Sequence, residues 1–281
     1  MDKAHDPLLA RCREIEQDDV SGATDLTLRA ADILLDAIAE GRAREIADVL
    51  VKAKPVMASL LNIAQAATDA YDPRQAREQV ERFRDSLQSA PVEAGRAAAD
   101  LVRALRDRCR IVTISASSAV EETIKDLCRT TSLTGLIIGE SRPRMEGRVM
   151  ALRLQRFFKA VRFTYDALLP GLLRPDSVVL IGADAVTDGA VYNKAGSLML
   201  ATVATMWDLP VLAVTTSHKV VPPYLRHRFA EGERAMVARA EERASKEDDP
   251  LFDLLFEAVS RDLLTAVVTE NGLLPGPVRK Q

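Results

Sequence analysis

Residues 109–140 read CRIVTISASSAVEETIKDLCRTTSLTGLIIGE, and this stretch decides the fold. It places two short apolar runs, CRIVTIS and TGLIIGE, on either side of a segment long enough for a helix. Three further runs follow, AVRFTY at 160–165, SVVLIGA at 177–183 and PVLAVTT at 210–216. Strands that are apolar on both faces and joined by helical crossovers form a parallel sheet covered by helices. The sequence therefore predicts a Rossmann-like α/β domain.

The residues before these runs predict helices. Leu28, Ala31 and Leu35 recur at the spacing of one helix face, and β-branched clusters are scarce in this part of the chain. The predicted fold class is thus α/β, with an N-terminal helical domain followed by a Rossmann-like parallel-sheet domain. We expect the helical domain to cover 1–105 and the sheet domain to cover 106–281.

Composition excludes several classes of protein. The chain has 281 residues, with 38 Lys+Arg against 41 Asp+Glu, a formal net charge of −3 and 4% aromatic residues. A nucleic-acid-binding protein needs a basic face and stacking platforms, so we expect no direct nucleic-acid partner. No uncharged apolar run reaches the roughly 18 residues of a membrane span, and acidic residues interrupt the start where a signal peptide would be apolar. We therefore expect a cytoplasmic protein with no membrane contact.

Metal-ligand spacing is absent. The three cysteines and three histidines lie far apart, at Cys12, Cys109, Cys128, His5, His218 and His227. A structural zinc site needs closely spaced pairs of such residues. The sequence predicts neither a metal nor another cofactor.

Small hydroxyl residues follow the first predicted strand. Ser115, Ser117 and Ser118 lead into a helical segment, and helix N-termini at the carboxyl edge of a parallel sheet can hold an anion. The alternative is simple N-capping, because Glu121 stands at the spacing of a capping box. Both interpretations place these residues at the start of a helix.

A guanidinium follows the second predicted strand. Arg142 could bind a phosphate with two hydrogen bonds. It could instead form an ion pair with Glu140 or Glu146 and hold the loop. The sequence leaves the two alternatives open.

Asp184 follows the strand SVVLIGA, and Asn193 and Lys194 are predicted to open the next long helix. A carboxylate that faces an amide and an ammonium group could act as a general acid or base beside an anion site. The alternative is an ion pair between Asp184 and Lys194 that closes a loop. Lys219, after the last predicted strand, could extend the positive lining or could simply be solvated.

Four ordered motifs carry a family resemblance: ESRPRMEGR, LIGADAVTDGAVYNKAGS, VLAVTTSHK and LLTAVVTENGLLP. In this order and spacing they resemble the superfamily of the alpha, beta and delta subunits of translation initiation factor 2B. That superfamily also contains methylthioribose-1-phosphate isomerase and ribose-1,5-bisphosphate isomerase. The resemblance implies a helical domain, a Rossmann-like domain that dimerises, and a sugar-phosphate or nucleotide pocket between the two domains.

The resemblance also assigns roles to residues. It implies that Asp184 is the catalytic aspartate of the isomerases, that Asn193 and Lys194 line the sugar, and that Lys219 matches a frequent lysine. The catalytic cysteine of the isomerases corresponds to Ser115, whose hydroxyl is far less acidic than a thiol. Cys109 stands six residues earlier, roughly 20 Å away along a strand, and cannot replace that thiol.

A second departure lies in the N-terminal part. The isomerases carry an R-G-A segment that helps to bind phosphate, and this chain has Ser21, Gly22 and Ala23 there. Loss of the arginine side chain of that segment, whose guanidinium can form two hydrogen bonds, should weaken phosphate binding by roughly 1.5 to 3 kcal/mol. Both departures favour a relative that binds a sugar phosphate or nucleoside phosphate and lacks ordinary isomerase catalysis.

Two alternatives remain. The chain could be an aldose-ketose isomerase for a phosphorylated pentose, such as ribose 1,5-bisphosphate or methylthioribose 1-phosphate, with Asp184 as acid and base. It could also join a translation-factor partner, which only the family name and the charged segment 231–249 suggest. A homodimer is expected in each case, because the resemblance implies it. The helix predicted in GSLMLATVATMWDL would offer apolar residues to that interface, namely Leu198, Met199, Val203, Met206 and Trp207.

Overall fold

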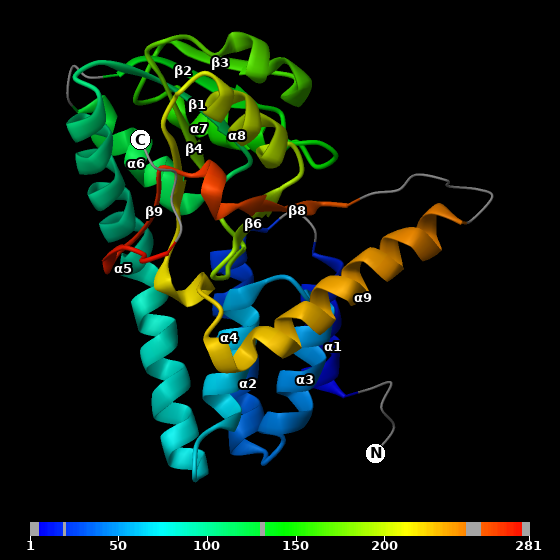
Figure 1. Cartoon of the computed structure of the whole chain (residues 1–281). Coiled ribbons are helices and arrows are strands. Elements are labelled where there is room, and N and C mark those ends of the chain that lie inside the picture. The colour runs from blue at the N-terminus through cyan, green and yellow to red at the C-terminus, as the bar shows by residue number, and fades with distance from the viewer. Residues whose placement is uncertain (1–5, 19–20, 130–132, 246–253, 277–281) are drawn as a thin grey trace. The chain divides into compact units, whose positions relative to one another are not determined.

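A computed structural model describes residues 6–18, 21–129, 133–245 and 254–276 (Figure 1). The chain divides into two compact units. The first combines Met1–Ser89 with His218–Leu254, and the second combines Ala90–Ser217 with Leu255–Gln281. The division into domains 1–105 and 106–281 stays a prediction. In the described part of the chain, no helix combines the length and the apolarity needed to cross a membrane.

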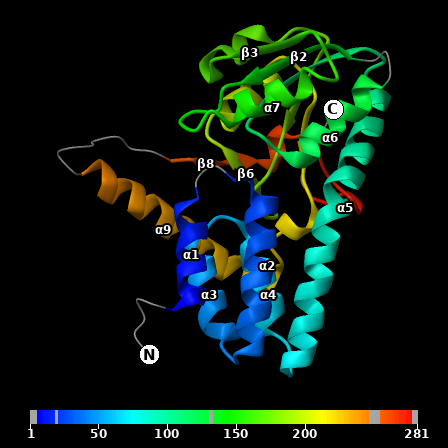
Figure 2. The same cartoon turned by 180° about the vertical axis from the view of Figure 1, so that it is seen from behind.

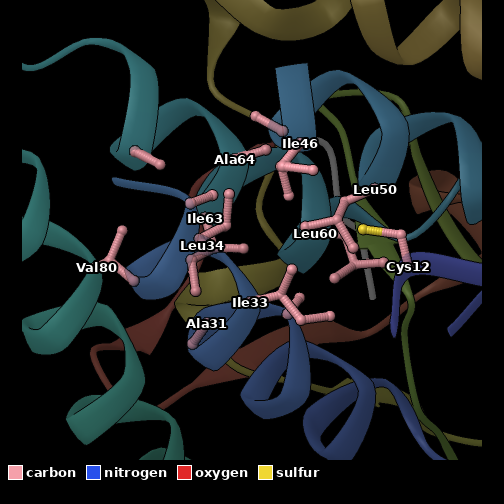
Figure 3. Packing of buried hydrophobic residues seen from close by; sticks show 14 of the residues in the cluster. Cys12, Ala31, Ile33, Leu34, Ile46, Leu50, Leu60, Ile63, Ala64 and Val80 are labelled. Atoms are coloured by element: carbon pink, nitrogen blue, oxygen red, sulfur yellow. The ribbon is translucent and has the colours of Figure 1, made fainter. Parts of the chain in front are cut away.

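The first unit is helical, as the sequence predicts. Its elements are α1 (Pro7–Gln17), α2 (Ala23–Ala39), α3 (Ala43–Ala53), α4 (Ala58–Thr68), the first part of α5 (Pro73–Leu105) and α9 (Arg226–Ala244). The apolar faces of α1 to α5 meet in one cluster, where Leu34, Leu60 and Ile63 are fully or almost fully buried (Figure 3). Burial of each such side chain contributes about 1.5 to 3 kcal/mol.

The start of α1 is fixed by Asp6. Its Oδ1 atom accepts hydrogen bonds from the backbone N–H groups of Leu8, at 3.0 Å, and Leu9, at 3.3 Å. Arg42 donates to Asp6 Oδ2 over 2.5 Å, and this hydrogen bond holds the pKa of the carboxyl group below its usual value. Asp6 therefore ties the N-terminus of α1 to the loop before α3.

The second unit contains the predicted sheet. Seven strands lie in the order β10-β9-β7-β4-β1-β2-β3, and all neighbours are parallel except the pair β10 and β9. The strands predicted from the five apolar runs are confirmed as β1 (Cys109–Ile114), β2 (Leu133–Gly139), β3 (Val161–Thr164), β4 (Ser177–Ile181) and β7 (Val211–Val214). Two further strands, β9 (Ala266–Thr269) and β10 (Gly272–Leu273), extend the sheet beyond them.

Helices cover both faces of this sheet. The helices α6 (Ser118–Cys128) and α7 (Glu146–Leu154) lie on one face (Figure 2), and α8 (Ser197–Met206) lies on the other (Figure 1). The side chains of β1, β2 and β4 that face α6 and α7 are buried in a single cluster with Val120 and Ile124. The fold class predicted from the sequence is confirmed.

A small antiparallel sheet corrects one local prediction. It consists of β5 (Ala185–Val186), β6 (Ala190–Lys194) and β8 (Phe256–Ser260), in that order. Asn193 and Lys194 were predicted to open a helix, and that prediction is wrong, because both lie on β6. Their strand partners in β8 come more than sixty residues later, so no local pattern reveals the pairing. Gly196, with a φ angle of 100°, turns the chain before α8 begins.

Candidate functional site

The strand order of the large sheet reverses between β1 and β4. From β1 the chain proceeds outward through β2 and β3, and from β4 it proceeds outward on the other side through β7 and β9. In open α/β sheets, ligands bind at the carboxyl ends of the strands beside such a reversal. Ser115 follows β1 there and Asp184 follows β4, so both predicted residues lie at this edge of the sheet.

Ser115 occupies a constrained turn. Its φ angle of 74° is in the left-handed region, and its backbone N–H group donates to Ser141 Oγ over 2.7 Å. Ser141 is itself fully buried, and its N–H group donates to Asp166 Oδ1 over 2.8 Å. The hydroxyl of Ser141 therefore joins the loops after β1 and β2, and the carboxylate of Asp166 joins the loop after β2 to the segment that follows β3. Sequence reasoning missed Ser141 and Asp166, although Ser141 lies in the quoted ESRP motif.

The serines at the start of α6 show the capping geometry. Ser117 is the N-cap residue, and its Oγ atom accepts from the N–H group of Val120 over 3.4 Å. Ser118 is the first residue of the helix and is exposed. Capping explains the position of Ser117, while anion binding at this helix N-terminus stays a prediction.

Gly182 lets three segments approach one another. A Cβ atom on Gly182 would lie 2.7 Å from the Cβ atom of Ser117 and 3.4 Å from Asn193 Oδ1. The missing side chain therefore allows the end of β4, the start of α6 and the strand β6 to meet. Ser117 and Asn193, predicted as site residues from separate motifs, are brought together here.

Asp184 lies beside β6. Its N–H group donates to the carbonyl oxygen of Tyr192 over 2.8 Å, and Ala185 and Tyr192 are partners in the antiparallel pair of β5 and β6. This register places Asp184 next to Asn193 at the end of the hairpin. Asp184 is half-buried, whereas only 3% of Asn193 is exposed.

Lys194 pairs with Glu146, which the sequence offered as one of two possible partners of Arg142. Lys194 Nζ lies 2.5 Å from Glu146 Oε1, and it also lies 5.7 Å from the centre of the Phe256 ring. Only 3% of Lys194 is exposed, so this ion pair is largely withdrawn from solvent. A buried cation needs such a partner, because an unpaired buried charge costs several kcal/mol.

Glu146 was considered in the sequence only as a possible partner of Arg142, and it was not predicted as a site residue. Its Oε2 atom is buried and has no hydrogen-bond partner among the residues that the structure describes. A buried carboxylate oxygen without a donor is costly, and a sugar hydroxyl would satisfy it. The signal was present in the motif ESRPRMEGR, where Glu146 opens the helix α7.

Arg142 adopts the ion-pair alternative. Its Nε atom donates to Glu140 Oε1 over 2.9 Å, and this hydrogen bond raises the pKa of the guanidinium. Its backbone N–H group donates to Asp166 Oδ2 over 2.8 Å. Arg142 therefore holds the loop after β2, and its predicted contact with a phosphate stays a prediction.

Four predicted site residues belong to the first unit. Ser21 donates through Oγ to Asp18 Oδ2 over 2.8 Å, Gly22 is the N-cap of α2, and Ala23 is the first residue of that helix. Lys219 is 9% exposed and lies in a short 3-10 turn, Ser217–Lys219. The role of these residues in ligand binding stays a prediction.

Cys109 lies at the opposite end of β1 from Ser115. It is the first residue of that strand and is fully buried, and burial raises the pKa of its thiol to about 11. At neutral pH it supplies almost no thiolate. Over the described ranges of the chain, the structure contains no group of three or more His, Cys, Asp or Glu side chains that could hold a metal ion.

The chain is similar to translation initiation factor subunits and to sugar-phosphate isomerases. The model of the initiation factor 2 subunit family, IF-2B, matches residues 19–276. A translation initiation factor eIF-2B subunit 2-like protein of Pyrococcus abyssi is 26% identical over 280 residues, covering 97% of this chain and 98% of its own length. A ribose 1,5-bisphosphate isomerase of Methanocaldococcus jannaschii is 24% identical over 246 residues, covering 84% and 78%.

A solved structure agrees with the fold. The crystal structure of the Pyrococcus horikoshii translation initiation factor eIF-2B superposes with a TM-score of 0.77 at 24% sequence identity. The match covers 95% of this chain and 96% of that chain. At this identity the agreement concerns the fold, so the function has to be argued from the site.

Proposed function

We propose that this chain, which belongs to the initiation factor 2 subunit family, binds a phosphorylated sugar or nucleoside and lacks ordinary isomerase catalysis. The family is related to sugar-phosphate isomerases, as the similarity to ribose 1,5-bisphosphate isomerase indicates. The proposed site is the carboxyl edge of the large sheet, between β1 and β4.

Ser115 is the observation that carries the proposal. No histidine or carboxylate in the described part of the chain forms a hydrogen bond with its hydroxyl group. A serine hydroxyl without an adjacent base neither ionises near neutral pH nor transfers a proton readily. The chain thus has no counterpart to the reactive thiol at this position, and Cys109 is at the wrong end of β1.

The surrounding groups support binding. The N-terminus of α6 presents free N–H groups of the kind that bind phosphate, next to the hydroxyls of Ser117 and Ser118. Glu146 Oε2 and the carboxylate of Asp184 are acceptors suited to sugar hydroxyls. The arrangement supports a ligand that carries both a phosphoryl group and several hydroxyl groups.

Asp184 supports a second candidate function, that of an aldose-ketose isomerase. This carboxylate lies beside Asn193, and the resemblance implies that it is the catalytic aspartate of the isomerases. It could move a proton between two carbons of an open-chain pentose phosphate. The third candidate, a subunit that joins a translation-factor partner, rests on the family and on the charged segment 231–249.

A thermal-shift screen tests ligand binding. Ribose phosphates, methylthioribose 1-phosphate and nucleoside monophosphates are added to the whole chain. A ligand at a hundredfold excess over its Kd adds about 2.7 kcal/mol to the free energy of unfolding, because it binds only the folded state. Asn193→Ala should abolish the shift, and the exposed Arg156→Gln should retain it. If none of these ligands shifts the wild type, the proposal fails.

The homodimer is the remaining part of the proposal. The outer side of α8 exposes Leu198, Met199, Met206 and Trp207, which an apolar interface would cover. Light scattering at micromolar concentration should give twice the mass of one chain. Trp207→Glu should shift the protein to the monomer, whereas Tyr224→Glu, which alters an exposed aromatic residue of the first unit, should not. A monomeric wild type would contradict this part of the proposal.

A further inference from the structure

We infer that a hollow at the amino-terminal half of β1, β2 and β3 is a second anion site, which binds the phosphoryl group of a small molecule. It has a volume of about 320 Å³ including its open mouth, and Arg110 and Arg162 line it together with Thr134, Gly135 and Ile137. The inference is independent of the candidate site, which lies at the opposite ends of the strands.

The register of the strands places both arginines on one face of the sheet. Arg110 is the partner of Gly135, and Arg162 is the partner of Ile137. Gly135 and Ile137 are two residues apart on β2, so all four side-chain positions point to the same side. From strand spacing and rise, the Cα atoms of Arg110 and Arg162 are about 12 Å apart. Two arginine side chains can contact one anion across that gap.

Gly135 directs Arg110 toward the hollow. A Cβ atom on Gly135 would lie 3.3 Å from Arg110 Nε and 3.5 Å from its Cγ atom. The Arg110 side chain therefore lies across β2, in the direction of β3 and Arg162. A larger residue at 135 would occupy the space in which the guanidinium rests.

Neither guanidinium has a partner among the described residues. Some arginines of this unit are paired, as Arg103 is with Asp126 and Arg142 is with Glu140, whereas the exposed Arg148 is not paired within the described part of the chain. No ion pair or side-chain hydrogen bond within the described ranges involves Arg110 or Arg162. Two unpaired guanidinium groups beside apolar lining residues can form bidentate hydrogen bonds to an oxyanion.

One acidic group lies beside the hollow. Asp176 Oδ2 accepts from Thr134 Oγ1 over 3.2 Å, and Thr134 is part of the lining. Its negative charge opposes an incoming anion. Removal of that charge should therefore strengthen anion binding, which a purely structural role of the arginines does not predict.

The lining favours a small phosphorylated molecule over a nucleic acid. None of the lining residues is aromatic, and Phe163 alternates to the other face of β3. A single-stranded nucleic acid would need such stacking surfaces. The concave shape and the two guanidinium groups are suited to one phosphoryl group.

Titration calorimetry of the whole chain with pyrophosphate at low ionic strength tests the site. Arg110→Gln and Arg162→Gln should each raise the Kd at least about tenfold, the usual effect of losing a charge-assisted hydrogen bond. Asp176→Asn should lower the Kd severalfold. Arg148→Gln, an exposed arginine at the start of α7, should leave it unchanged.

Two kinds of result would overturn the inference of a second anion site. If the wild type does not bind, or if Arg148→Gln weakens binding as much as Arg110→Gln, the inference is overturned. If Asn193→Ala removes all pyrophosphate binding and the hollow variants remove none, binding belongs to the candidate site and the inference also fails. Loss in the hollow variants alone supports it, whatever the candidate site binds. Crystals soaked in tungstate should then show an anomalous peak between Arg110 and Arg162.

Discussion

Gly147→Ala is expected to lower the free energy of unfolding by about 3 to 5 kcal/mol. A Cβ atom on Gly147 would lie 1.8 Å from the carbonyl oxygen of Gly139 and 2.7 Å from Ser141 Oγ. The backbone of Gly139 cannot move aside as a flexible side chain would. The first turn of α7 therefore has to move away from the end of β2. Overpacking alone costs about 1 to 3 kcal/mol.

The displacement has a second effect. Glu146 precedes Gly147 and pairs with the buried Lys194, so a shift of α7 separates the two charges. Breaking a buried ion pair costs about 3 to 5 kcal/mol when both charges stay buried, and less when they reach solvent. Alanine is better than glycine inside a helix by about 1 kcal/mol, which does not offset these losses.

Urea denaturation followed by circular dichroism measures this effect. Gly189→Ala is the matched control, because a Cβ atom there would meet nothing within 4 Å. The control should change stability by no more than about 0.5 kcal/mol. Equal unfolding midpoints for the two variants would show that α7 does not depend on this close approach.

The second large effect concerns catalysis. The wild type is expected to form ketose phosphate from ribose 1,5-bisphosphate or methylthioribose 1-phosphate very slowly or not at all. Ser115→Cys combined with Ser21→Arg should raise the rate by about 10²- to 10⁴-fold, the usual contribution of a positioned proton-transfer group. A thiol at position 115 would stand just before the N-terminus of α6, where its pKa falls and thiolate becomes available.

Two variants control this experiment. Asp184→Asn in the double variant should abolish the gain, because the carboxylate is the remaining proton-transfer group. Ser118→Cys combined with Ser21→Arg should give no gain, because Ser118 is exposed on α6 and does not occupy the position of the isomerase cysteine. Wild-type turnover of about 1 s⁻¹ or faster would overturn the non-catalytic proposal and favour the isomerase.

The sequence predicted five strands from their apolar runs, but it missed β9, which is also a buried apolar run. The runs CRIVTIS, TGLIIGE and PVLAVTT contain buried strands that end at Ile114, Gly139 and Val214, and their composition is enough to identify them. The strand β6 was missed because it ends in Asn193 and Lys194, which are polar and yet buried through contacts with β8. Pairing between segments so distant in the chain leaves no periodic pattern in either one.

The sequence also predicts the positions of two candidate site residues, but not the contacts around them. Ser115 and Asp184 follow strands, and the carboxyl ends of parallel strands share one edge, so their location follows from topology. The contact of Lys194 with Glu146 does not follow from topology. It depends on how closely α7 approaches β2, which Gly147 decides through the absence of one methyl group.

The pairing of Lys194 with Glu146 also determines how easily the site can change its ligand. With Glu146 ionised, the two charges cancel, and an anion gains little from Lys194. A substitution that removes the carboxylate would free a full positive charge, but it would leave a buried ammonium group unpaired in the empty protein. Affinity for anions and stability without ligand are therefore opposed at this position. A lineage that changes residue 146 alters both properties in one mutational step.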